Sequence, residues 1–144
     1  MAEQNFKNHT RLVPGFHYVA FSLVLFSLVV GAIHFCKSIE AGSGRLSAAA
    51  ELGLAVAVVL ALWFSRTFSL KAQDRAIRSE ENFRHFVATG KPFDSRLSIQ
   101  QIIGLRFADD AEFVDLAKKA AEENLSQKQI KEAITKWKSD HHRV

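Results

Sequence analysis

The feature that most constrains this chain is an uncharged apolar stretch near its beginning. Between Pro14 and Lys37, 22 residues contain no Asp, Glu, Lys or Arg. As a helix they rise about 1.5 Å per residue, which is enough to cross the ~30 Å hydrocarbon core of a bilayer. We therefore predict a membrane-spanning helix over residues 16–36.

A second apolar stretch follows between Arg45 and Arg66 and contains a single charged residue, Glu51. Glu51 falls in the first turns, where a carboxylate still reaches water or headgroups. Residues 55–64 (AVAVVLALWF) are apolar on every side, whereas a helix in the core of a soluble protein usually keeps a polar face. This pattern predicts a second span over residues 48–65 and a loop over 37–47.

The distribution of Lys and Arg around the spans predicts their orientation. Two basic residues, Lys37 and Arg45, lie in the loop, and more lie outside it: Lys7, Arg11, Arg66, Lys71, Arg75, Arg78 and Arg84. Because basic flanks stay on the cytoplasmic side, we expect both termini in the cytoplasm, the tail 1–15 included. Tyr18 and Trp63 agree, since both then lie at the cytoplasmic interface, where amphipathic rings settle.

The second helix is not expected to end at the membrane. Nothing from Ser65 to Thr89 breaks a helix, and the first such signal is Gly90-Lys91-Pro92. We predict a cytosolic helical extension over residues 66–90. It carries an apolar stripe at spacings of four and seven, and this stripe needs a covering partner. Its residues are Phe68, Ala72, Ala76, Phe83 and Val87.

A basic face lies on the same extension and comprises Arg66, Lys71, Arg75 and Arg78. One interpretation is that it sets the topology and keeps the helix solvated. The other is that it contacts anionic headgroups, at ~1 kcal/mol per charge near the surface. Most of the formal charge of +4 lies in residues 66–96 and is not spread over a nucleic-acid-binding face, so no nucleic acid partner is predicted.

Small residues predict where helices meet inside the membrane, because they let two backbones approach closely. The second span carries Ala49, Gly53, Ala57 and Ala61, and the first carries Ser27 and Gly31. Packing between the two spans is one use of these residues. Oligomerisation or docking onto a larger membrane protein is the other. Glu51 is expected to pair with His34, Lys37 or Arg45 at the outer surface.

Residues 91–144 predict a small cytosolic domain of three short helices. Polar caps at Ser98, Asp109 and Ser126 open helices over residues 99–107, 110–124 and 127–138, and each cap is followed three residues later by Gln or Glu. Each helix has one apolar face. The core is marginal for an independent domain, so the unit is expected to lean on the long helix, a second copy or another protein.

Motifs of catalysis are missing from the sequence. It has no phosphate-binding glycine loop, no G-x-S-x-G and no H-E-x-x-H, and its one cysteine, Cys36, excludes an internal disulfide. Asp140, His141 and His142 offer metal-binding groups, but adjacent histidines near a free end usually remain solvated. No catalytic residue, metal ligand or cofactor is predicted.

Four segments carry a family resemblance. They are residues 4–9 (QNFKNH), 73–86 (QDRAIRSEENFRHF), 101–110 (QIIGLRFADD) and 134–143 (ITKWKSDHHR). In these segments the chain resembles an uncharacterised family of small bacterial membrane proteins, a domain of unknown function. The resemblance implies a bacterial inner membrane, two spans and a cytosolic helical tail, and it assigns no activity. Phe83 and Phe86 stand where the family is expected to have aliphatic residues.

The sequence thus predicts an all-α protein: a two-span transmembrane helical hairpin whose second span extends into a long cytosolic helix, followed by a small three-helix unit. The expected function is that of a non-catalytic, membrane-anchored interaction module or accessory subunit. It docks another membrane or cytosolic protein, or a second copy, through its cytosolic helices. The alternative is a peripheral anionic-lipid sensor that uses the basic face. A small enzyme or transporter component lacks supporting residues.

Overall fold

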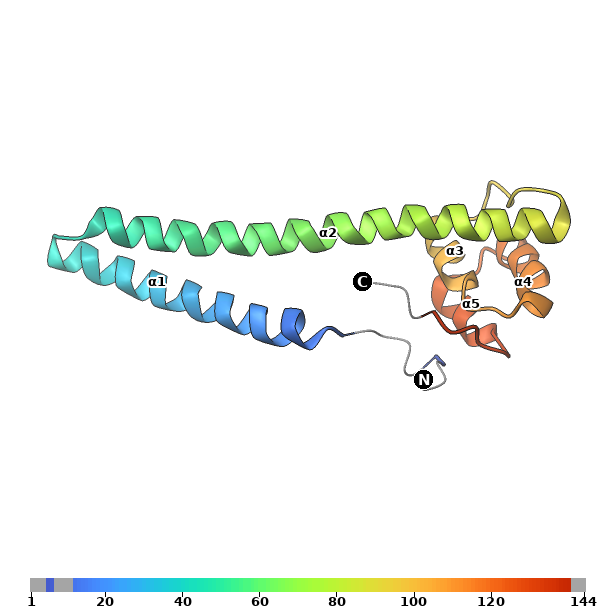
Figure 1. The fold of residues 1–144 in the computed structure, drawn as a ribbon, viewed down its shortest axis with the longest axis horizontal. Coiled ribbons are helices and arrows are strands. Elements are labelled where there is room, and N and C mark those ends of the chain that lie inside the picture. The colour runs from blue at the N-terminus through green and yellow to red at the C-terminus, as the bar shows by residue number, and fades with distance from the viewer. Residues whose placement is uncertain (1–4, 7–11, 141–144) are drawn as a thin grey trace. The chain divides into compact units, whose positions relative to one another are not determined.

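The computed structural model describes residues 5–6 and 12–140. Its helices follow one another in chain order as a π-helical segment η1 (Gly15–Ala20), α1 (Phe21–Ala41), α2 (Arg45–Thr89), α3 (Ile99–Leu105), α4 (Asp110–Glu122) and α5 (Gln127–Ala133) (Figure 1). Within this described part no strand forms, and the one β-type contact is an isolated bridge between Ala108 and Trp137. The predicted all-α fold, its extended second helix included, is confirmed.

The chain divides into two compact units. The hairpin unit is Leu12–Phe68, and the C-terminal unit is Ser69–Val144 together with Met1–Arg11. The helical stretches Gly15–Ala41 and Arg45–Thr89 are both long and apolar enough to cross a membrane.

The connection between α1 and α2 is shorter than the sequence predicts. A loop is expected over residues 37–47, but α1 continues to Ala41 and α2 begins at Arg45. The chain reverses at Gly42 and Gly44, which have φ angles of 69° and 70°. Glycine adopts this left-handed conformation without strain and commonly ends a helix. Charged residues such as Lys37 mark the edge of the apolar stretch, but they do not end a helix.

The predicted end of the long helix is confirmed at Thr89. Gly90 follows with a φ of 72°, and its N–H donates to the Phe86 carbonyl at 2.8 Å. Pro92 then prevents the chain from re-entering the helix.

The three short helices begin where their caps predict. Ser98 with Gln101 and Ser126 with Gln129 form complete capping boxes at the starts of α3 and α5. At α4 only half of the expected arrangement forms: the Asp109 side chain accepts from the Ala111 N–H at 3.2 Å, while Glu112 bonds elsewhere.

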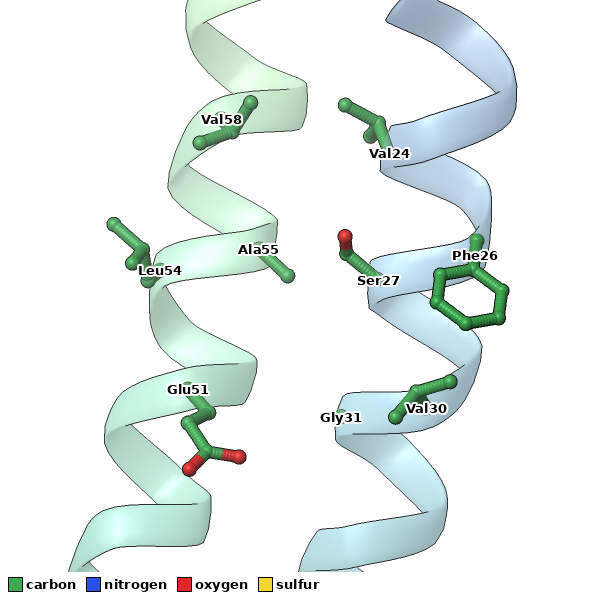
Figure 2. A pocket seen from close by; sticks show the side chains of 9 residues that line it. All are labelled: Val24, Phe26, Ser27, Val30, Gly31, Glu51, Leu54, Ala55 and Val58. Carbon is green, nitrogen blue, oxygen red and sulfur yellow. The ribbon is translucent and has the colours of Figure 1, made fainter.

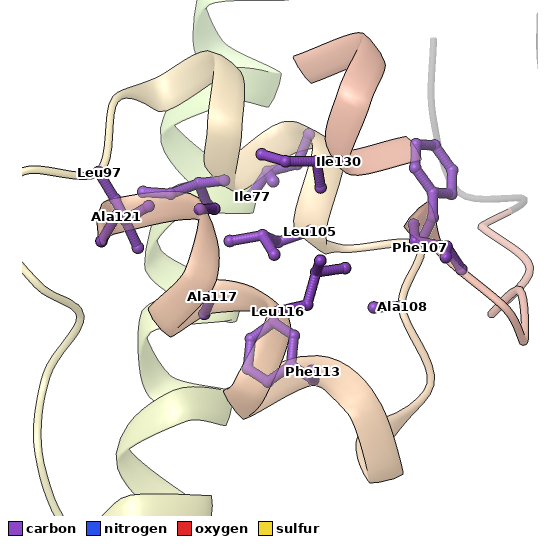
Figure 3. Packing of buried hydrophobic residues seen from close by; sticks show 13 residues of the cluster. Ile77, Leu97, Leu105, Phe107, Ala108, Phe113, Leu116, Ala117, Ala121 and Ile130 are labelled. Carbon is purple, nitrogen blue, oxygen red and sulfur yellow. The ribbon is translucent and has the colours of Figure 1, made fainter. Parts of the chain in front are cut away.

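The core of the C-terminal unit lies between α3, α4, α5 and one face of α2 (Figure 3). Phe107 and Phe113 are its largest fully buried side chains. The long helix contributes Ile77, which is 7 % exposed. From the sequence, this small core was expected to lean on the long helix, a second copy or another protein, and in the structure it packs against the long helix.

The last predicted helix is shorter than expected. It ends at Ala133 instead of residue 138, and Ile134 is extended with φ −68° and ψ 120°. The backbone N–H groups of Thr135 and Lys136 both donate to the Glu112 carboxylate, at 3.0–3.2 Å. The Lys138 N–H donates to the Phe107 carbonyl at 2.8 Å. These partners lie more than twenty residues away, so the local pattern does not reveal them.

Candidate functional site

The apolar stripe on α2 lies at the surface. Phe68, Phe83 and Val87 are 61, 67 and 70 % exposed, and Ala72 and Ala76 are exposed as well. Phe86, which the sequence analysis did not include, is 50 % exposed beside them. Its position three residues after Phe83 was the available signal, since i and i+3 share a helix face. In the C-terminal unit, the exposed surface of Phe83, Phe86 and Val87 is named the aromatic patch.

Arg84 fixes which face of α2 turns toward the core of its unit. Its Nε donates to Asp110 at 2.7 Å, and its two Nη groups donate to Glu81 at 3.0 Å and to the Ala108 carbonyl at 2.8 Å. The guanidinium also lies 4.0 Å from the centre of the Phe113 ring. Together these contacts hold Arg84 and Ile77 inward, and the aromatic patch remains exposed among the described residues of the unit.

The basic face differs from Arg84 in having no internal partner. Arg66 is half-buried, and Lys71, Arg75 and Arg78 are exposed. Across residues 5–6 and 12–140, none of the four forms an ion pair, although acids on α2 and α4 pair with Arg84. Their charges are therefore directed to solvent or to an external anion.

Two of these arginines line a cavity of about 380 Å³ in the C-terminal unit. The cavity lies between α2, the segment that follows Pro92, and the first turn of α3. Its lining comprises Arg75, Arg78, Ser79, Asn82, Phe93, Asp94, Ser95, Leu97 and Ile102. The sequence analysis found the two arginines but not the serines and Asn82, which only the fold brings beside them.

The segment after Pro92 is held in place by its own hydrogen bonds. The Phe93 N–H donates to Asn82 Oδ1 at 2.8 Å. Arg96 Nη2 donates to Asp94 Oδ2 at 2.7 Å, and Arg96 Nε contacts both oxygens of that carboxylate at 3.1 Å. The side-chain hydrogen bond from Arg96 lowers the pKa of Asp94 to about 2. Asp94 is thus ionised and already paired at neutral pH.

Within the hairpin unit, Ser27 and Gly31 of α1 line a groove of about 370 Å³ opposite Glu51, Ala55 and Val58 of α2 (Figure 2). Glu51 has a partner on α1: His34 Nδ1 lies 2.7 Å from Glu51 Oε2. From the sequence, Glu51 was expected to pair with His34, Lys37 or Arg45, and in the structure the partner is His34.

The small residues predicted on α2 are not brought together with those of α1. Gly31 is buried, and a Cβ there would lie 3.4 Å from the Leu52 Cα. Ala49, Gly53, Ala57 and Ala61 are all exposed, and a Cβ on Gly53 would have no neighbour within 4 Å. The buried alanines of α2 are Ala48 and Ala55. On this other face Gly31 lies against Leu52, where a Cβ would make ordinary van der Waals contact.

No group of three or more His, Cys, Asp or Glu side chains is placed to hold a metal ion in the part of the chain that the structure describes. Of the candidate cluster near the end of the chain, His141 and His142 lie outside the described residues. Cys36 is exposed on α1.

Comparisons with known proteins give a match to one family. The model of a family of unknown function, DUF6526, matches residues 1–144. No curated protein and no solved structure matches the chain.

Proposed function

Since the chain belongs to the DUF6526 family, whose function is unknown, we propose from the chain's own surfaces that it is a non-catalytic membrane-anchored interaction module. The hairpin anchors it in a bacterial inner membrane with both termini in the cytoplasm. The C-terminal unit docks a partner protein or a second copy of the chain. The observation that carries this proposal is the aromatic patch of Phe83, Phe86 and Val87.

The patch is suited to docking because the unit does not use it internally. Its core is closed by Ile77 and Arg84 on a different face of α2. Large apolar side chains that gather on the surface of a water-exposed unit usually mark an interaction site. Burying one such side chain in an interface removes it from water, with a gain of about 1.5–3 kcal/mol.

The first experiment measures assembly of the full chain. After gentle detergent extraction, the wild type should elute as a species larger than a monomer, and the F83S/V87S variant should lose that association. L70S is the matched control, because Leu70 is also exposed on α2, at 38 %, but lies outside the stripe. A strictly monomeric, partner-free wild type would count against docking.

A second experiment distinguishes a second copy from another protein. Cys36 is the single cysteine of the sequence, so C36S gives a background without thiols. In that background V87C places one cysteine in the aromatic patch. After oxidation of isolated native membranes with copper phenanthroline, disulfide-linked dimers would identify a second copy as the occupant, whereas a monomer beside a retained larger complex would identify a different protein.

The proposed orientation can be tested independently. Cys36 lies near the end of α1 that faces outward in this topology, so a membrane-impermeant thiol reagent should label it in intact cells. The C-terminal unit should resist protease added from outside. Digestion of that unit in intact cells would reverse the orientation.

A second candidate function is contact with anionic lipids through Arg66, Lys71, Arg75 and Arg78. The observation that favours it is the absence of ion pairs on these four side chains within the described part of the chain. Replacing all four by Gln should reduce the phosphatidylglycerol that co-purifies with the protein, measured by lipid mass spectrometry. K118Q/K119Q is the control, since both lysines are exposed on α4. Unchanged lipid retention in the quadruple variant would remove this candidate.

A further inference from the structure

We propose that the cavity lined by Arg75 and Arg78 is a binding pocket for the phosphate group of a small phosphoester. This inference rests on the second candidate function, contact of the basic face with anionic groups, and narrows it to one site and one chemistry. The phosphate belongs either to a lipid headgroup or to a soluble molecule, and the two sources share the recognition chemistry described below.

The charge of the cavity is positive because its acid is already neutralised. Asp94 is the one carboxylate in the lining, and Arg96 holds it through both oxygens. Arg75 and Arg78 have no ion pair within the described residues. Two uncompensated guanidinium groups thus remain at one cavity, separated by three positions on α2. Guanidinium groups bind phosphate through paired, charge-assisted hydrogen bonds, which makes this arrangement suited to a phosphate group.

Neutral donors surround the two charges. Ser79 of α2 and Ser95 of the facing segment also line the cavity, and each carries a hydroxyl group that can donate. Asn82 uses its Oδ1 to accept from Phe93, so its amide nitrogen is left to donate. Hydroxyl and amide donors complete the coordination of phosphate oxygens that the two arginines leave open.

The segment after Pro92 is held by contacts within the unit, and the cavity is formed without a ligand. Phe93 is fixed by the bond to Asn82 and by its ring, whose centre lies 5.7 Å from that of Phe113 in the core. Leu97 is only 5 % exposed. A preformed site loses less free energy to ordering on binding than a flexible one.

The volume of the cavity and the apolar residues in its lining indicate a ligand larger than a bare phosphate ion. Its volume of about 380 Å³ falls within the range typical of small-molecule sites. Phe93, Leu97 and Ile102 give it an apolar side opposite the charges. A phosphate that carries a small organic group, such as glycerol phosphate or the headgroup of phosphatidylglycerol, matches both parts.

The experiment compares two double variants of the full chain in detergent micelles. Glycerol phosphate is titrated into each protein and followed by isothermal titration calorimetry, with inorganic phosphate as a second probe. R75Q/R78Q should weaken binding of glycerol phosphate by about tenfold for each guanidinium removed. K118Q/K119Q removes the same charge from α4, outside both the cavity and the basic face, and should bind as the wild type does. Both pairs of side chains are free of internal ion pairs within the described residues, so neither variant is expected to change the fold.

Lipid retention then identifies the source of the phosphate. If R75Q/R78Q loses more co-purifying phosphatidylglycerol than R66Q/K71Q, the pocket takes a lipid headgroup. If lipid retention is the same while glycerol phosphate binding is lost, the pocket takes a soluble phosphoester. Either result supports the pocket.

Two results would overturn it. One is a wild-type protein that binds neither glycerol phosphate nor inorganic phosphate. The other is an equal loss of glycerol phosphate binding in R75Q/R78Q and K118Q/K119Q, which would indicate a diffuse effect of charge. The second candidate function would survive either result if the quadruple variant still lost anionic lipid, so failure of the pocket and failure of the lipid contact are distinguishable.

Discussion

Replacing Gln101 by Ala should destabilise the C-terminal unit far more than the same replacement at Gln129. Both glutamines complete a capping box, since each accepts from the backbone N–H of its N-cap serine at 2.8 Å. Only Gln101 is buried, at 4 % exposure. Its Nε2 also donates to the carbonyls of Ala120 and Leu125, at 3.1 and 2.9 Å, and so joins the start of α3 to the end of α4.

The magnitude follows from the bonds that differ between the two positions. Each variant loses the cap bond from the backbone N–H of its serine, and both gain the same helix propensity of Ala. Q129A also loses the exposed bond that the Ser126 hydroxyl donates to Gln129 at 2.7 Å. Q101A additionally loses one buried and one partly buried hydrogen bond. The Leu125 carbonyl then lacks its donor, whereas the Ala120 carbonyl keeps the Leu125 N–H at 3.2 Å. At about 1 kcal/mol for each bond, and more where a buried carbonyl remains unsatisfied, Q101A should be less stable than Q129A by about 2–4 kcal/mol.

Amide hydrogen exchange of the full chain, measured by mass spectrometry, provides the assay. Opening of the C-terminal unit limits the exchange of its most protected amides, so a loss of 2 kcal/mol or more should accelerate that exchange roughly 30-fold or more in Q101A relative to Q129A. Peptides from α1 should exchange as in the wild type and serve as an internal control. Equal acceleration in the two variants would refute the assignment of stability to the buried bonds of Gln101.

Three further outcomes are expected. Burial raises the pKa of Glu112, but the Thr135 hydroxyl and two backbone N–H groups outweigh it and lower the pKa below its ordinary 4.5. The stability that the carboxylate contributes is therefore present above that pH and is lost as the pH falls through the lowered pKa. E112Q should flatten the acid side of a plot of thermal-unfolding temperature against pH, and an unchanged plot would argue against the bond. G104V should destabilise the unit by about 1–3 kcal/mol, because even a Cβ at that position would lie 3.2 Å from Ile130 Cγ2. A denaturant titration measures this loss, and a midpoint equal to that of the wild type would show that α5 can shift. G90A should cost about 1–2 kcal/mol through backbone strain alone, since its φ is 72° and nothing lies near its Cβ; the same denaturant titration measures it, and no loss would mean that the helix end adjusts.

Features encoded by neighbouring residues were predictable from the sequence. The end of α2 at Thr89 follows from Gly90 and Pro92, and the starts of α3 and α5 follow from the serine caps. In each case the signal and the structure lie within a few positions of each other. Local sequence patterns are sufficient for such features.

Features that depend on distant contacts were not predictable. The pattern at Asp109 suggests that Glu112 closes a capping box, but its carboxylate instead receives Thr135 and Lys136 and ends α5 early. The buried face of α2 in the hairpin carries Ala48 and Ala55 and not the most regular run of small residues, which is exposed.

The candidate surfaces likewise have parts that were predictable from the sequence and parts that were not. Charge and periodicity were sufficient to find Arg75, Arg78 and the apolar stripe on one helix. The cavity around the arginines also needs Ser95 and Phe93, whose positions depend on how the segment after α2 folds back. Residues that share one face of a single helix can be recognised from their spacing in the sequence. A pocket formed by separate segments can be recognised only when the fold is known.

The extended segment that follows α5 has a consequence for biosynthesis. Lys136 and Lys138 pair with the backbone of Asp109 and Phe107, so the C-terminal unit lacks one of its walls until these late residues have left the ribosome. The apolar hairpin emerges long before that point. The two long helices are therefore synthesised before the unit behind them can close.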